Sequence, residues 1–110
     1  MAIKKSINIS AYNRFAWDQQ VYQKNKFTVP VDHSTILKAR EGDFSIYLTE
    51  TLPVPRSWFP DSFRGIDILG LACGGGQRGP ILAALCANVT IFDNSPAQLE
   101  TDITIANREG

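Results

Sequence analysis

Apolar positions in the second half of the chain form short continuous runs separated by a segment with helical spacing. Residues 66–71 and 89–92 are near-continuous apolar runs, which are typical of strands buried on both faces in a parallel sheet. Between them, Pro80 marks the first turn of a helix, where its missing N–H costs nothing. The apolar face of that helix consists of Ile81, Leu82 and Leu85.

A second helix is predicted directly after the second strand. Asp93 and Asn94 form a turn, and Ser95-Pro96-Ala97-Gln98 combines a capping box with proline at the first helical position. This helix should run to about Arg108 and stop at Gly110. The predicted order is therefore strand, glycine-rich loop, helix, strand, acidic turn and helix, and such crossovers imply parallel strands with right-handed connections.

The first half of the chain is less regular. A helix capped by Ser10 is predicted to run to about Lys24, and its wide apolar arc predicts packing on two sides. A short helix from Ser34 to Glu41, stopped by Gly42, should follow. Residues 44–48 carry a partly alternating strand signal, with a possible extent of 44–50. Residues 51–65 hold three prolines and several aromatic residues, which indicates a packed loop rather than a flexible linker.

Composition narrows the class of protein. The 110 residues are 44% hydrophobic, which fits one small globular domain and excludes a disordered tail. Eleven basic and eleven acidic residues cancel, so the charge indicates neither nucleic acid nor an anionic membrane as a partner. No apolar run approaches the roughly 20 residues of a membrane span, and the N-terminus does not resemble a signal peptide. Two cysteines, Cys73 and Cys86, then read as reduced thiols of a cytoplasmic protein.

The glycine-rich loop is the strongest chemical signal in the sequence. "LACGGGQRGP", residues 71–80, follows the first predicted strand, and a turn of this kind is expected to leave backbone N–H groups free for a ligand. Asp93 follows the neighbouring strand, 19 residues after Gly74, a distance at which an acid can accept hydrogen bonds from the hydroxyls of a ribose. The two features together predict a site for an adenosine-type cofactor.

Two cofactor classes fit this loop. Residues 74–79 satisfy the dinucleotide pattern G-x-G-x-x-G, but this match is weak in a segment so rich in glycine. Ala72-Cys73-Gly74-Gly75-Gly76, followed by "ANVTIFDNSPAQLE", resembles class I S-adenosylmethionine-dependent methyltransferases, whose loop is approximately G-C-G-x-G. "NRFAWD", residues 13–18, is similar to the lead-in helix of a bacterial subset of these enzymes. The resemblance is specific from Ile66 to Arg108 and weaker from Ser10 to Pro60.

The resemblance implies a set of cofactor contacts and identifies no catalytic residue. The implied S-adenosylmethionine-binding residues are Ala72, Cys73, Gly74, Gly76, Asp93 and Asn94. Arg14 and Trp17 are candidates for a lid over substrate or cofactor, with packing and a surface ion pair as the favoured alternative. One histidine and two scattered cysteines make no metal site, so none is expected. Cys73 reads as a small buried residue rather than a nucleophile.

Three positions depart from the family pattern. Gly70 stands where an acid is common, and Ala72 stands at the first loop glycine. Cys86 occupies the place of a helix-ending glycine, and we expect Asn88 to take the left-handed turn instead because a non-glycine residue there costs roughly 1–2 kcal/mol.

The expected fold is α/β, a partial Rossmann-like parallel sheet preceded by an N-terminal helical segment. Residues 1–65 form the lead-in and residues 66–110 the first half of a cofactor-binding domain, which is incomplete beside the seven-stranded sheet that the resemblance implies. We therefore expect an S-adenosylmethionine-binding N-terminal part of a methyltransferase, inactive by itself and prone to dimerise through its open sheet. An NAD(P)- or flavin-binding oxidoreductase fragment and a non-catalytic interaction module remain as alternatives.

Overall fold

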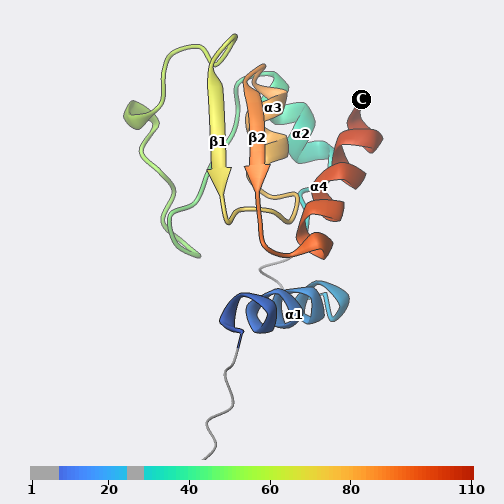
Figure 1. Ribbon diagram of the computed structural model, residues 1–110. Coiled ribbons are helices and arrows are strands. Elements are labelled where there is room, and N and C mark those ends of the chain that lie inside the picture. The colour runs from blue at the N-terminus through green and yellow to red at the C-terminus, as the bar shows by residue number, and fades with distance from the viewer. Residues whose placement is uncertain (1–7, 25–28) are drawn as a thin grey trace, which may run out of the picture.

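The computed structural model describes residues 8–24 and 29–110, and it has the α/β order expected from the sequence (Figure 1). Two parallel strands pair in register from Asp67 opposite Asn88 to Leu71 opposite Phe92. This confirms the predicted parallel pair with a helical crossover. In chain order the elements are α1 (Ile9–Tyr22), α2 (His33–Arg40), the 3-10 helix η2 (Arg56–Trp58), β1 (Asp67–Leu71), α3 (Gly79–Ala84), β2 (Asn88–Phe92) and α4 (Pro96–Glu109).

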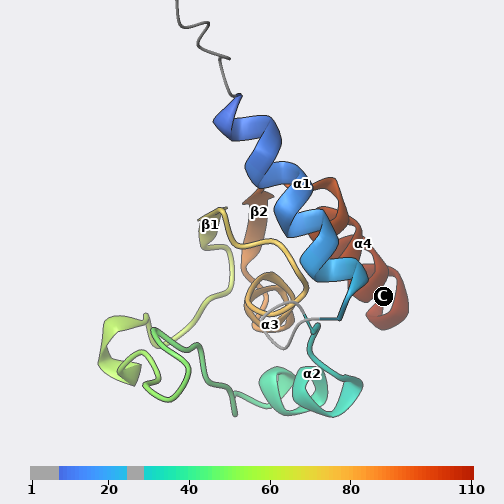
Figure 2. The same cartoon turned by 90° about the horizontal axis from the view of Figure 1, so that it is seen from below.

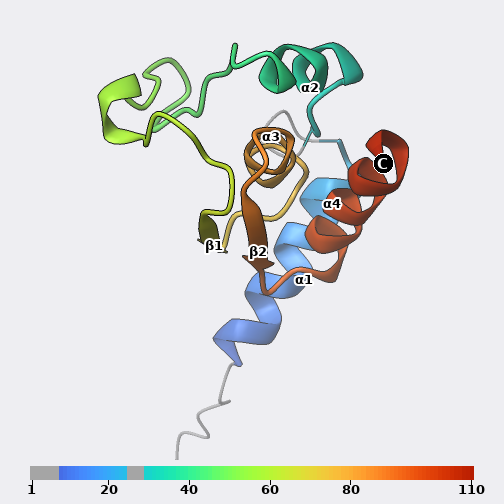
Figure 3. The same ribbon diagram turned by 90° about the horizontal axis from the view of Figure 1, so that it is seen from above.

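The helices α3 and α4 lie on one side of the sheet, and α2 lies beyond α3 (Figure 3). Ala39 of α2, Ile46 and Ile81 of α3 form a buried cluster in this layer. Helix α1 lies outside this layer, next to α4 and on the side of the sheet where the strands end (Figures 1 and 2). The N-terminal segment thus contacts the strand–helix units mainly at two places, α2 on α3 and α1 on α4. The domain division at residue 65 stays a prediction.

The opposite face of the sheet is open in the described part of the chain. Leu69, Leu71 and Phe92 are 57%, 70% and 62% exposed, whereas Ile68 and Ile91 on the helix side are partly buried. The prediction that both strands are buried on both faces is therefore wrong here. The strands carry apolar residues on both faces. However, α3 and α4 cover the same face, as right-handed crossovers dictate for strands added in one direction.

Helix α1 differs from its prediction in its cap and in its burial. Asn8, not Ser10, caps the helix, and its side-chain oxygen accepts the backbone N–H of Ala11 at 3.0 Å. None of its residues is buried, and Phe15 and Tyr22 are 63% and 67% exposed. The expected packing on two sides is absent among the described residues, because α1 contacts the fold mainly through α4 and the turn after β2.

The segment between α2 and β1 is a packed loop, as expected, but it holds no strand in the described structure. Residues 44–48 form only an isolated antiparallel bridge between Tyr47 and Pro53. The aromatic rings of Phe44, Phe59 and Phe63 pack on one another with centroids 5.6–5.8 Å apart. Ring packing within the loop therefore orders this region together with a few backbone bonds, such as that from the Val54 N–H to the Ile46 carbonyl at 2.6 Å.

The ends of the helices show where local sequence signals succeed and fail. Ser95 caps α4 by accepting the backbone N–H of Gln98, and Gly110 ends that helix, both as predicted. Asp32 caps α2, and Gly42 follows it with a φ of +88°. After α3, however, Cys86 itself takes the left-handed conformation with a φ of +72°. The expectation that Asn88 would do so is wrong, because Asn88 is already the first residue of β2 and its N–H donates to the Ile66 carbonyl.

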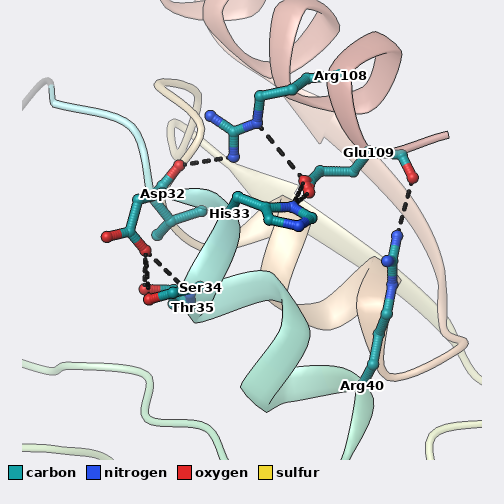
Figure 4. A network of polar contacts seen from close by, with 8 residues as sticks. Asp32, His33, Ser34, Thr35, Arg40, Arg108 and Glu109 are labelled. Atoms are coloured by element: carbon teal, nitrogen blue, oxygen red, sulfur yellow. Dashed lines mark hydrogen bonds and ion pairs between the residues drawn. The ribbon is translucent and has the colours of Figure 1, made fainter.

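A network of polar contacts joins α2 to the end of α4 (Figure 4). The ring of His33 contacts the Glu109 carboxylate, and the Arg40 guanidinium donates to the Glu109 carbonyl at 2.8 Å. Arg108 donates to the carbonyl of Val31 at 3.0 Å. These contacts hold the second helix of the chain against its last turn, 69–77 residues away in sequence.

Across residues 8–24 and 29–110, no helix is long and apolar enough to cross a membrane. Cys73 and Cys86 are both free thiols.

Candidate functional site

The glycine-rich loop leaves β1 at its carboxyl end and turns directly into α3, beside the end of β2. Ala72 begins the turn with a φ of +54°, and its N–H donates to the Phe92 carbonyl at 2.7 Å. Gly75 and Gly76 have φ values of +117° and +73°, conformations that favour glycine. The loop is therefore held at its start by β2 and turned by two glycines.

The N–H groups of three consecutive glycines are bound by the protein's own carboxylates. Gly74 donates to Asp93 Oδ2 at 2.9 Å. Gly75 and Gly76 donate to the two oxygens of Asp102 at 3.1 and 3.0 Å. The expectation that these N–H groups point outward to a ligand is therefore wrong, since each already has a partner within the fold.

Asp102 is a site residue that the sequence reasoning missed. It lies on α4, four residues after the buried Gln98 and three before the buried Ile105, so all three occupy one helix face. Burial raises the pKa of the Asp102 carboxyl and the nearby Asp93 adds to this, while the N–H groups of Gly75 and Gly76 oppose the rise. An acid at helical spacing between two inward-facing residues was the available signal.

The glycines are required by the protein's own packing. A Cβ added at Gly74 would lie 3.0 Å from Gln98 Cβ, and one at Gly76 would lie 2.8 Å from Pro30 Cβ. These close neighbours come from α4 and from the segment before α2, so the fold itself requires glycine at both positions. A Gly74→Val substitution would therefore disturb the fold around the loop as well as any ligand.

Crowding also explains Gly70 in β1, the position at which the resemblance leads us to expect an acid. A Cβ at Gly70 would lie 2.3 Å from Cys73 Sγ and 2.7 Å from Ile91 Cδ1. Cys73 thus fills the space beside Gly70, as a small, partly buried residue. Burial raises the pKa of the Cys73 thiol, with Arg78 opposing the rise, so the environment does not favour the thiolate that a nucleophile requires.

The acidic turn after β2 is bound from both sides. Asp93 Oδ1 accepts the N–H of Ser95 at 2.8 Å while its other oxygen holds Gly74. The Arg14 guanidinium donates to the Asn94 backbone and side-chain oxygens at 3.0 Å each, and the Asn94 amide donates to the Ser10 carbonyl at 2.7 Å. Arg14 therefore anchors α1 on this turn rather than forming an ion pair.

Trp17, the other lid candidate, does not contact the acidic turn in any hydrogen bond of the described residues. Trp17 is 48% exposed on α1. The structure thus brings together Gly74, Asp93, Asn94 and Arg14, places Ala72 and Cys73 in the adjoining loop, and leaves Trp17 at the surface.

The region beside the glycine-rich loop is rich in hydrogen-bond acceptors. A carboxylate has about four lone-pair positions, and Asp93 uses one on each oxygen, so each oxygen can accept one further hydrogen bond. Asp93 and Asp102 together put two carboxyl groups beside the loop and occupy its donors. The region can therefore accept hydrogen bonds from a hydroxylated or cationic ligand but offers little to an anion.

Among the described residues, neither a metal site nor the main cavity coincides with the loop and Asp93. In the described ranges, no group of three or more histidine, cysteine, aspartate or glutamate side chains could hold a metal ion. A cavity of about 580 Å³ lies between α2, α3, β2 and α4 and reaches Asp102, but Gly74, Gly76 and Asp93 do not line it.

Comparison with known proteins agrees with the resemblance found in the sequence. No family model matches the chain. It is 46% identical over 100 residues to "Uncharacterized methyltransferase YbaJ" of Bacillus subtilis (strain 168). The aligned region covers 91% of this chain and 39% of that protein, so the chain spans well under half of its relative. The chain is therefore a homologue of part of a protein named as a methyltransferase, which confirms the expected resemblance.

Proposed function

We propose that this chain is the S-adenosylmethionine-binding part of a methyltransferase. The observation that carries the proposal is the capture of the Gly74, Gly75 and Gly76 N–H groups by Asp93 and Asp102. A dinucleotide cofactor places its pyrophosphate on the N–H groups of such a loop. Here those donors are occupied and two carboxyl groups lie beside them, which disfavours a pyrophosphate.

The charge of S-adenosylmethionine suits the same surroundings. Its sulfonium and ammonium groups are cationic, so nearby carboxylates attract it where they would repel a phosphate. The two free acceptor positions of Asp93 match the two hydroxyls of its ribose. The charge supports S-adenosylmethionine over the nicotinamide and flavin alternatives, whereas the match to ribose hydroxyls is shared by all of these cofactors.

The role of these residues in the proposed reaction is binding and orientation. When bound, the cofactor supplies an activated methyl group for an in-line displacement. Asp93 would hold the ribose, and the loop from Ala72 to Gly76, with Cys73 packed inside it, would form the wall beside it. Asn94 and Arg14 would keep the turn in place. Alignment of this kind is the main contribution a protein makes to such a transfer.

The methyl acceptor and any catalytic base belong, in this proposal, to a longer protein. The relative is named as an uncharacterized methyltransferase, and the chain spans 39% of its length. The two-stranded parallel sheet would be the first part of a larger Rossmann-like sheet, which explains a face left open at Leu69 and Leu71. A cytoplasmic location, and inactivity of these residues by themselves, remain predictions.

Isothermal titration calorimetry of the protein with S-adenosylmethionine, S-adenosylhomocysteine and NAD tests the proposal. We expect binding of the first two, and Asp93→Ala should weaken it by about 1–3 kcal/mol, the range for hydrogen bonds to a charged acceptor. Asp61→Asn, a change of an exposed carboxylate between η2 and β1, is the control and should leave affinity unchanged. Binding of NAD alone would overturn the proposal, and binding of no adenosine ligand would favour the interaction-module alternative.

A further inference from the structure

A continuous chain of hydrogen bonds links α1 to the glycine loop. Asp18 Oδ1 accepts the hydroxyl of Ser95 and the N–H of Ala97. The N–H of Ser95 donates to Asp93 Oδ1, and Asp93 Oδ2 accepts the N–H of Gly74. Each link joins the next through one residue, so the path from Asp18 to Gly74 has no gap.

The middle of this path is buried and the start is not. Ser95 is 0% exposed, and its hydroxyl is used twice, as donor to Asp18 and as acceptor from the N–H of Gln98. The Ser95 N–H goes to Asp93 instead of to the Gln98 side chain, so only half of the capping box forms. Gln98 Oε1 is consequently buried without a hydrogen-bond partner among the described residues. The orientation of Asp93 is thus preferred over full satisfaction of the helix cap.

Helix α1 depends on these polar contacts for its position. It has no buried residue, so burial of apolar side chains contributes little to its docking. Two side chains of α1 bind the segment on either side of Ser95. Arg14 donates to Asn94, and Asp18 accepts the N–H of Ala97 in the first turn of α4. A helix held in this way belongs to the least stable part of a fold, and its docking can respond to a ligand.

We propose that Asp18 is a positioning residue for the cofactor-binding carboxylate Asp93, and that docking of α1 and cofactor binding are coupled through Ser95. The proposal rests on the proposed function for the identity of the ligand. The path through Ser95 does not depend on that identity. Because coupling between two sites is reciprocal, cofactor binding should also strengthen the docking of α1.

The first test compares cofactor affinities in a double-mutant cycle. Asp18→Asn keeps the shape of the side chain but weakens the acceptor, and it should lower the affinity for S-adenosylhomocysteine by about tenfold, a typical strength for coupled sites. In an Asp93→Ala background the same change should have no further effect. Asp61→Asn is the charge-matched control. Equal effects of Asp18→Asn in both backgrounds would overturn the positioning role.

The second test needs no ligand. Hydrogen exchange of the Gly74 amide reports the last bond of the path, and Asp18→Asn should speed it while Asp61→Asn leaves it unchanged. If Asp18 only caps α4, its variant will lower the melting temperature and speed exchange in the first turn of that helix, with Gly74 exchange and cofactor affinity unaltered. That result would also overturn the proposal. Failure of the wild type to bind any adenosine ligand would contradict the proposed function alone, since the exchange experiment still decides the coupling.

A reporter on α1 tests the reciprocal effect. In a Trp58→Phe background, Trp17 is the single tryptophan and lies next to Asp18. S-adenosylhomocysteine should change its fluorescence in the wild-type background and should change it less at saturation in Asp18→Asn. An identical response in both proteins would show that α1 does not follow the site.

Discussion

Two of the three described non-glycine residues with a positive φ lie in the turns before and after α3. Ala72 and Cys86 have φ values of +54° and +72°, and both are exposed, so no packing is lost by shortening them. Relief of the left-handed strain outweighs the extra entropy that glycine loses on folding. We therefore expect Ala72→Gly and Cys86→Gly each to raise the free energy of unfolding by about 0.5–1 kcal/mol.

Urea denaturation followed by circular dichroism measures both changes. Ala72 begins the loop before α3 and Cys86 lies in the turn after it, so their effects should add. A loss of stability at Ala72 alone would mean that its methyl group makes a contact that the loop requires.

At Gly70, in contrast to Ala72 and Cys86, we expect glycine to be the more stable residue. Its Cβ would meet Cys73 Sγ and Ile91 Cδ1 closer than real atoms approach, so Gly70→Ala should destabilise the protein by about 1–3 kcal/mol, as overpacking does. Adding Cys73→Ala removes the nearer obstacle and should restore part of the loss. Thermal melts of the single and double variants provide the measurement. No recovery in the double variant would place the whole penalty on Ile91.

At the scale of elements, polar and charged contacts hold α2 against the end of α4. The hydrogen bond from His33 lowers the pKa of the Glu109 carboxyl below its usual 4.5, and the charges of His33 and Arg108 act in the same direction. A lowered pKa means that the ionised form is stabilised in the folded state. The resulting stability is present above the unfolded pKa and is lost as pH falls through the folded one.

Glu109→Gln should therefore melt at a lower temperature than the wild type at a pH of about 5.5, and the gap should narrow as the pH approaches about 3. Fluorimetric melting across this range is the measurement, with Asp61→Asn, a change of an exposed carboxylate, as the control. A gap that stays constant with pH would show that the ionisation of Glu109 does not contribute.

At the scale of the whole molecule, the sheet is open where a larger fold would cover it. Leu69 and Leu71 of β1 and Phe92 of β2 share the uncovered face, and an open apolar face or edge is a template for another chain. We expect these 110 residues by themselves to associate at micromolar concentration, most simply as a two-fold dimer. Light scattering measures the molar mass.

A matched pair of variants locates the contact surface. Leu69→Ser should shift the chain toward monomer, whereas Ile103→Ser, at a similarly exposed position on α4, should not. A wild-type monomer with well-dispersed NMR signals would contradict the expectation.

From residue 66 onward, the order of elements, the parallel pairing and the type of loop could be predicted from the sequence. These follow from local signals: two short apolar runs, Pro80 and Pro96 at helix starts, Ser95 as a cap, and glycines between β1 and α3. Such signals act over a few residues, so they can be read without a fold. The methyltransferase resemblance depended on the same stretch.

Tertiary structure alone decided what surrounds the loop. Gly74 and Gly76 are close to Gln98, Pro30 and Ile105 because α4 and the segment before α2 pack onto them. Asp102 and Asp18 reach the site from two helices, and nothing in their own sequence surroundings sets those distances. Contacts between residues 26 to 79 positions apart depend on how the helices pack, and no local pattern encodes that.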